Sequence, residues 1–127
     1  MRRRADEIVA RARTLIGTRF RPQGRTRSGG LDCIGLVALA VGLRTVPADY
    51  PLRGGPPGRL ARELKSAGFD QVREMQAGDV LALAPAAGQL HLGLFSGTGL
   101  IHADAGLGRV VERPLPLPWP VTGIWRY

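Results

Sequence analysis

The chain has 127 residues, a length that fits one compact domain over residues 1–127 and is too short for two. Hydrophobic residues make up 44% of the chain and charged residues 22%, which is typical of a globular domain. The single cysteine cannot form an intrachain disulfide, which excludes a disulfide-stapled scaffold. No apolar run approaches the roughly 20 residues of a membrane helix, so no membrane span is predicted.

Positive charge is concentrated at the start of the chain. The formal net charge is +8, and residues 1–30 contain nine arginines against only two acidic residues, a net of +7. This asymmetry indicates an acidic partner, which could be nucleic acid, an anionic cell-wall polymer or an acidic protein surface. A solvated basic face in an arginine-rich chain is the simpler alternative and stays open at this point.

The first residues do not have the pattern of a secretion signal. Met1-Arg2-Arg3-Arg4 resembles a basic leader, but charged side chains interrupt what would be its apolar segment. We therefore expect synthesis in the cytoplasm without a signal peptide, and a carrier if the protein acts outside the cell.

The first third of the chain predicts two helices. Apolar residues recur at helical spacing over residues 5–16, and a loop rich in Gly and Arg follows over residues 18–30. Residues 32–43 predict a helix that is apolar nearly all round and should therefore be buried, and Asp32 can act as its N-cap.

The remainder of the chain predicts one short helix and then strands. A long loop over residues 44–58 precedes the helix, which runs from Arg59 to Ala67. The stretch 114–120 alternates Pro with Leu or Trp, so we expect a loop outside the sheet ladder and a docking edge. Helices followed by a mostly antiparallel sheet of five or six strands predict an α+β fold, with the helices on one face. The predicted strands cover residues 79–84, 90–96, 100–103, 109–113 and 122–127.

The one cysteine comes directly after the N-cap position of the buried helix. Unpaired N–H groups and the dipole at a helix start favour an anion, so they are expected to lower the pKa of the Cys33 thiol and to favour the nucleophilic thiolate. A small buried cysteine that only fills the core is the ordinary alternative.

The two histidines lie on a predicted hairpin. A loop of two or four residues centred on residues 96–99 pairs His102 with Gly93, which places His91, Gly93 and His102 on one face. The imidazoles then become diagonal neighbours, and Gly93 leaves the space between them empty. A three-residue loop would reverse the parity and remove this arrangement. The opposite face takes Leu92, Leu94 and Ile101.

These three side chains can form a hydrolytic triad. Cys33 would be the nucleophile and His91 the general base and later the acid, while His102 would bond the second ring nitrogen of His91 and fix its tautomer. The N–H of Cys33 at the helix start would stabilise the oxyanion. The same atoms could instead bind zinc, but the usual C-x-x-C and H-E-x-x-H spacings are absent. We therefore predict neither a metal nor another cofactor.

At these residues the sequence resembles the NlpC-type cell-wall cysteine peptidases, a papain-like family. Residues 31–37 (LDCIGLV) are similar to their D-C-x-G-L-V motif, and residues 91–97 (HLGLFSG) are similar to their H-V-G-I-Y-x-G segment. Residues 100–103 resemble the F-I-H-A segment that follows. Residues 77–80 resemble the P-G-D strand start, and residues 16–20 resemble a G-x-P-Y stretch.

The resemblance implies a papain-like NlpC fold and hydrolysis of peptide bonds in peptidoglycan stems, commonly between D-glutamate and diaminopimelate. It implies Cys33, His91 and His102 as the triad. It also implies substrate binding by Asp32, because in some members this Asp holds the free amine of the stem peptide. Phe20 stands where the family has Tyr, which removes a hydroxyl near the nucleophile, and both Phe20 and Ile34, often Ser in the family, bear on substrate preference.

The compact size and the D-C-x-G-L-V form resemble most the subgroup encoded with phage and gene-transfer-agent tails. This resemblance implies a virion component that rides on the tail tip and opens the wall of the target cell, in its periplasm, during DNA delivery. The implied partners are peptidoglycan and a tail-tip or hub protein.

Two other functions stay open. One is a structural tail-tip or assembly protein that keeps the fold with little activity. The other is an arginine-rich nucleic-acid binder, but residues 1–30 contain a single aromatic residue, Phe20, to interleave with the arginines. We therefore predict no specific nucleic-acid partner.

Overall fold

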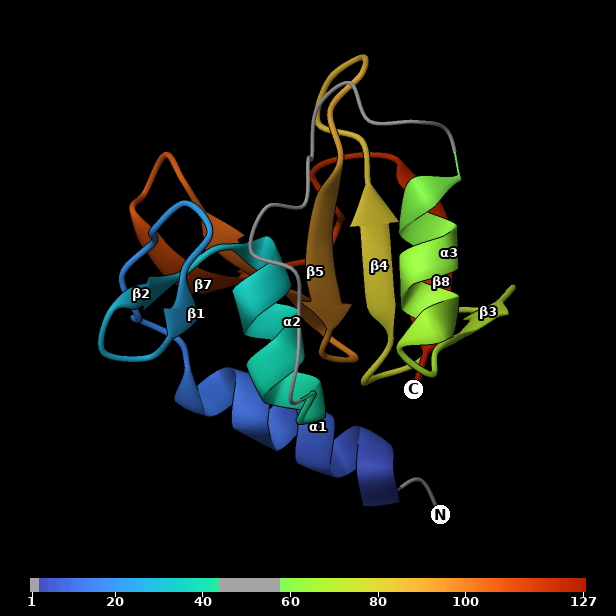
Figure 1. Cartoon of the computed structure of the whole chain (residues 1–127), viewed down its shortest axis with the longest axis horizontal. Helices are drawn as coiled ribbons and strands as arrows, with labels where there is room; N and C mark the ends of the chain where they lie inside the picture. The colour runs from blue at the N-terminus through green and yellow to red at the C-terminus, as the bar shows by residue number, and fades with distance from the viewer. Residues whose placement is uncertain (1–2, 44–57) are drawn as a thin grey trace.

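The computed structural model describes residues 3–43 and 58–127. The described chain forms three helices, a short hairpin and one larger sheet (Figure 1). Most of the loop predicted over residues 44–58 lies outside the described residues. The helices are α1 (Arg3–Thr14), α2 (Cys33–Val41) and α3 (Arg59–Ser66).

The larger sheet has six strands in the order β3-β8-β4-β5-β6-β7, and every neighbouring pair in it is antiparallel. Strands β4 to β7 follow one another as a meander, and the last strand returns to lie between β3 and β4. An antiparallel sheet of this size with helices against it confirms the predicted α+β class. The strands are β3 (Asp70–Val72), β4 (Val80–Leu83), β5 (His91–Phe95), β6 (Gly99–Asp104), β7 (Arg109–Pro114) and β8 (Val121–Arg126).

Three short strands were not predicted. Strands β1 (Arg25–Thr26) and β2 (Gly30–Leu31) form a hairpin inside the segment predicted as a loop, and β3 lies between α3 and β4. Each has only two or three residues. An alternating pattern needs about four residues to be recognised, so such short strands leave no periodic signal.

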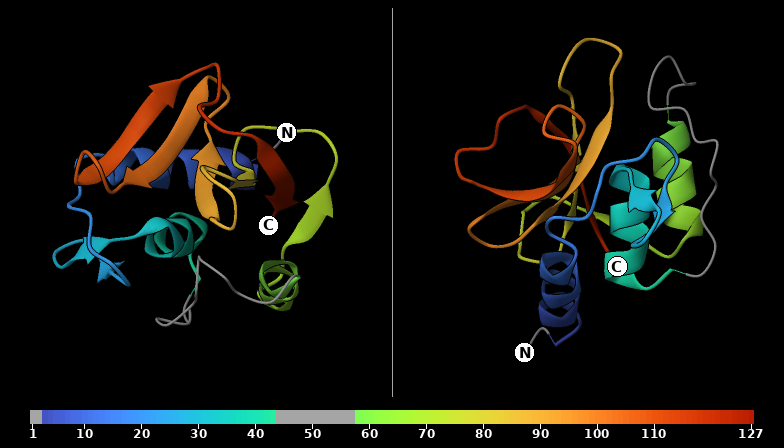
Figure 2. Two further views of the ribbon diagram at one scale, coloured as in Figure 1. Left: turned by 90° about the horizontal axis from the view of Figure 1, so that it is seen from above. Right: turned by 90° about the vertical axis from the view of Figure 1, so that its left-hand side faces the viewer.

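Helix α2 is the central helix of the fold. Asp32 is its N-cap, as predicted, and its carboxylate accepts a hydrogen bond from the Gly35 N–H at 2.8 Å. Helix α2 packs against β5 and β6, and α1 packs against α2. Figure 2 shows α2 and α3 on the same side of the sheet. Their side chains and those of one sheet face form the main core, in which Leu36, Leu94 and Ile101 are fully buried.

The second face of the sheet is covered differently. A smaller apolar cluster there contains Leu81, Leu83, Phe95 and Leu100. Its cover comes from residues 115–120, which link β7 to β8 outside the sheet ladder. Leu117 and Trp119 of this Pro-rich segment pack against the cluster. These two apolar side chains therefore face the protein interior.

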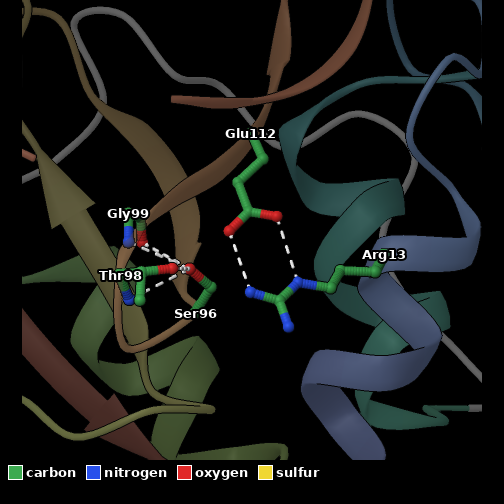
Figure 3. A network of polar contacts seen from close by, with 5 residues as sticks. All are labelled: Arg13, Ser96, Thr98, Gly99 and Glu112. Carbon is green, nitrogen blue, oxygen red and sulfur yellow. Dashed lines mark hydrogen bonds and ion pairs between the residues drawn. The ribbon is translucent and has the colours of Figure 1, made fainter. Parts of the chain in front are cut away.

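Glu112 ties α1 to the sheet near the β5–β6 turn (Figure 3). Arg13 donates to both carboxylate oxygens of Glu112, through Nε and Nη2, at 3.1 Å each. This hydrogen-bonded pair is the main reason that the pKa of Glu112 is lowered, and the hydroxyls of Ser96 and Thr98 act in the same direction. The interaction joins the first helix to β7, the strand that pairs with the histidine-bearing strand β6.

No helix among residues 3–43 and 58–127 is both long and apolar enough to cross a membrane.

Candidate active site

The β5–β6 hairpin has the register that the sequence predicts. Leu94 pairs with Ile101 and Phe95 pairs with Leu100. The Ser96 N–H then donates to the Gly99 carbonyl at 2.9 Å, which leaves a loop of two residues. Continued by one residue, the same register places His102 opposite Gly93. The even loop parity on which the histidine argument depends is therefore confirmed.

The two imidazoles are in direct contact. His91 Nε2 and His102 Nδ1 lie 3.0 Å apart, and the ring planes are nearly perpendicular at 86°. Gly93 serves a different purpose from the one predicted. A Cβ added there would lie 2.4 Å from Cδ1 of Leu100, so the glycine makes room for Leu100 and not for the imidazoles.

The Cys33 thiol is buried at the start of α2, with 2% of the residue exposed. Burial raises its pKa to about 12, although the N–H of Leu92 partly opposes this change. The sequence predicts a lowered pKa, and for the resting site that prediction is wrong. A helix start lowers a thiol pKa when the thiol is near water, but here the loss of hydration outweighs the backbone N–H groups.

The imidazoles are uncharged at neutral pH for the same physical reason. Burial lowers the pKa of His91 to about 4, the charge of His102 lowers it further, and Asp104 and Asp32 oppose the change. Burial also lowers the pKa of His102. In the part of the chain that the structure describes, no hydrogen bond joins the Cys33 sulfur to either ring. The resting site thus holds a neutral thiol beside two neutral imidazoles.

All five predicted site residues line one cavity of about 460 Å³. The predicted nucleophile comes from the start of α2, and the two histidines come from β5 and β6. The five residues are Phe20, Asp32, Cys33, His91 and His102. Segments far apart in the sequence therefore meet at a single opening that a substrate can enter.

Asp32 holds the entrance of the cavity together. Besides capping α2, its carboxylate accepts from Arg25 Nη1 at 2.7 Å and from the Gln23 N–H at 3.1 Å. These contacts join the helix start to the segment around β1. Asp32 also lines the cavity, and its negative charge adds to the rise in the pKa of Cys33.

Trp119 is a cavity residue that sequence reasoning missed. Its ring lies edge-on to both imidazoles, with centroid distances of 5.4 Å to His91 and 5.5 Å to His102. The indole therefore removes water from both rings, which contributes to the burial that lowers their pKa values. Nothing in the local sequence around Trp119 indicates this contact, because it depends on how residues 115–120 fold back over the sheet.

Asp104 is the second residue that was missed. It lines the same cavity, and its Oδ2 lies 3.9 Å from His102 Nε2. A signal for it was present, since a residue two positions after His102 on a strand points to the same face.

No group of three or more His, Cys, Asp or Glu side chains that could hold a metal ion occurs within residues 3–43 and 58–127.

No protein-family model matches the chain, and comparison with curated proteins finds no relative. Solved structures do resemble it. The NlpC/p60 domain of the peptidoglycan hydrolase SagA has a TM-score of 0.60 and 29% identity, over 87% of this chain and 88% of that chain. The peptidoglycan hydrolase RipB from Mycobacterium tuberculosis has a TM-score of 0.65 and 26% identity, over 98% of this chain and 65% of its own.

A third similar structure is RipD from Mycobacterium tuberculosis, described as a non-catalytic NlpC/p60 domain protein adapted to peptidoglycan binding. Its TM-score is 0.62 at 17% identity, over 98% of this chain and 97% of that chain. The chain therefore has the fold of NlpC/p60 domains, as its sequence motifs predict. This fold carries hydrolases as well as a non-catalytic protein, so activity has to be argued from the site.

Proposed function

We propose that the protein is a cysteine peptidase that cleaves peptide bonds in peptidoglycan, with Cys33 as nucleophile, His91 as general base and His102 as the residue that orients His91. The observation that carries this proposal is that all three residues line one cavity, with the imidazoles 3.0 Å apart. The similar structures of the hydrolases SagA and RipB support it.

Catalysis starts from uncharged groups. The Cys33 side chain turns from the Leu92 N–H toward the cavity, and its proton passes to Nδ1 of His91 as the sulfur attacks the carbonyl carbon. The N–H of Cys33 stabilises the resulting oxyanion. The C–N bond then breaks, and His91 returns the proton to the leaving amine. Water, deprotonated by His91, hydrolyses the thioester and regenerates the thiol.

Substrate binding would use the other cavity residues. Asp32 borders the cavity with a carboxylate, which suits the free amine of a stem peptide. Phe20 gives the cavity an apolar wall without a hydroxyl. The resemblance of the sequence to NlpC-type peptidases supports the bond between D-glutamate and diaminopimelate as the one that is cleaved.

We further propose that a phage or gene-transfer-agent tail carries the protein to the wall of the target cell, where it opens a path for DNA. The support is the resemblance of the sequence to that subgroup. The net charge of +7 over residues 1–30 offers a basic surface for an acidic tail-tip or hub protein, and Arg4, Arg19 and Arg21 are exposed there.

A structural or peptidoglycan-binding role with little activity is the second candidate. It is favoured by one specific observation: the buried thiol, whose pKa is about 12, has no hydrogen bond to an imidazole among the described residues. RipD shows that a protein of this fold can be non-catalytic.

Incubation with purified peptidoglycan separates the two candidates. The protein and its Cys33→Ala variant are incubated with the same material, and the released stem peptides are identified by mass spectrometry. The peptidase proposal requires products from the wild type only, with a new amine at the cleaved bond. Circular dichroism of both proteins serves as the folding control. Equal products from both proteins, or none from either, would overturn the proposal.

A further inference from the structure

One buried ring nitrogen of the site has no hydrogen-bond partner. His102 is fully buried, and its Nε2 is unpaired within the described residues. The carboxylate of Asp104 faces it, with Oδ2 3.9 Å away. The other oxygen of this carboxylate, Oδ1, accepts the Leu107 N–H at 2.9 Å in the turn after β6. Asp104 thus has one oxygen committed to the turn and one turned toward the imidazole.

The protonation of the histidine pair has two possible arrangements, because each neutral ring carries one N–H. In the first, His91 donates from Nε2 to Nδ1 of His102. This leaves Nδ1 of His91 bare, and it puts the proton of His102 on Nε2, toward Asp104. In the second, His102 donates from Nδ1. His91 then carries its proton on Nδ1, and Nε2 of His102 is bare.

Only the first arrangement can accept the proton of a thiol, because Nε2 of His91 is occupied by the bond to His102. The charge of Asp104 distinguishes the two. In the first arrangement its negative oxygen faces an N–H, which is attractive. In the second it faces a nitrogen lone pair, which is repulsive in a site from which water is removed.

We propose that Asp104 is a positioning residue, which selects through His102 the tautomer of His91 that has a bare Nδ1. Its role in catalysis rests on the proposed function, whereas its effect on the tautomers does not. The same carboxylate stabilises the positive charge that develops on the histidine pair when His91 takes a proton. Arg113 of β7 acts against this charge, and Asp32 beside α2 acts with Asp104.

The test is the protonation state of the four ring nitrogens at pH 7, observed by nitrogen-15 NMR of the full chain with labelled histidine. In the wild type we expect both rings to carry their proton on Nε2. In Asp104→Asn the amide oxygen can keep the bond to the Leu107 N–H, so its NH₂ group takes the place of Oδ2. The N–H groups of the amide then face Nε2 of His102 in place of a negative oxygen, and both rings are expected to change to the Nδ1-protonated form.

Two further variants make the result specific. Asp70→Asn removes an exposed carboxylate on β3, the edge strand three strands away from β5, and should leave both tautomers unchanged. Asp104→Glu keeps the negative charge and should keep the wild-type tautomers. A role limited to the turn would predict no difference between Asp104→Asn and the wild type in the ring nitrogens.

The inference is overturned if His91 in the wild type carries its proton on Nδ1, or if Asp104→Asn leaves both rings as they are. The first result needs only the native protein, so it decides the matter even if the variant does not fold. If the wild type cleaves peptidoglycan, kcat should fall roughly tenfold or more in Asp104→Asn with little change in KM, as expected for a base held in the wrong tautomer. If the tautomers change but no peptidoglycan is cleaved, the peptidase proposal fails and the role of Asp104 stands.

Discussion

The two faces of the sheet contribute different parts of the site and are buried in different ways. The face toward α2 is covered by helices with regular apolar spacing, and Cys33 belongs to its core. The opposite face carries His91 and His102 on the same side as Phe95 and Leu100, and its cover includes residues of an irregular Pro-rich segment. The nucleophile and the base thus approach one cavity from two different layers of the protein. In the resting site the thiol bonds the N–H of Leu92 on the strand between these layers, and not an imidazole of the described residues.

The largest expected effect is on the rate of hydrolysis, and it comes from a histidine on the sheet face away from α2. His91→Ala removes the general base and should lower the rate of peptidoglycan hydrolysis by about a hundredfold to ten-thousandfold. His102→Ala should have a smaller effect on the rate, because it removes only the group that orients the base. Both rates are measured from the release of stem peptides, with the melting temperature as the folding control. If His91→Ala kept the wild-type rate, the imidazoles would have no part in the chemistry.

The second prediction concerns Cys33, which belongs to the core between α2 and the sheet. Because burial raises the pKa of Cys33 to about 12, little thiolate is present at neutral pH. The rate of alkylation by iodoacetamide should therefore increase about tenfold for each pH unit between pH 7 and 9. The same protein unfolded in urea provides the control, since its thiol is exposed to water. A rate that is constant from pH 5 to 8 would instead mean that a thiolate–imidazolium pair already exists.

The same pKa predicts how stability depends on pH. A thiol whose pKa is 9.0 when exposed and about 12 in the folded protein binds its proton more tightly in the folded state. The free energy of unfolding should therefore fall as the pH rises above 9. Cys33→Ser should weaken this alkaline loss, which urea unfolding at pH 8 and pH 10 can measure. An identical loss in the variant would show that Cys33 does not cause it.

The difference between the faces also shows what could be predicted from the sequence. Helix α2, its Asp32 cap and the parity of the β5–β6 hairpin follow from local rules of spacing and turn length, and all were predicted. The contact of Trp119 with the histidines and the raised pKa of Cys33 were not. Both depend on tertiary burial, which a local pattern does not report. Asp104 lies between these cases, because its distance of two residues from His102 was visible in the sequence.

The fourth prediction tests the cover of the second face. Trp119→Ala should remove the indole from both imidazoles and admit water, so the pKa of His91 should rise from about 4 toward its usual 6.5. Loss of the packed ring should also lower the free energy of unfolding by about 2 kcal/mol, less than for a fully buried Trp. Histidine titration by NMR and urea unfolding measure the two effects. Trp119→Phe keeps a ring there and should retain most of the shift; an unchanged pKa in Trp119→Ala would show that other groups bury the rings.

The smallest effect concerns the connection between α1 and β7. Glu112→Gln removes the charge that pairs with Arg13, which is half exposed, so the free energy of unfolding should fall by only about 0.5 kcal/mol. Because the pKa of Glu112 is lowered in the folded protein, this contribution is present above the unfolded pKa of 4.5 and is lost as the pH falls through the lower folded value. Wild type and variant should therefore differ in urea unfolding at pH 7 and converge near pH 3. Equal stability at pH 7 would mean that packing alone holds α1 against β7, and that the charge pair adds nothing to the free energy of unfolding.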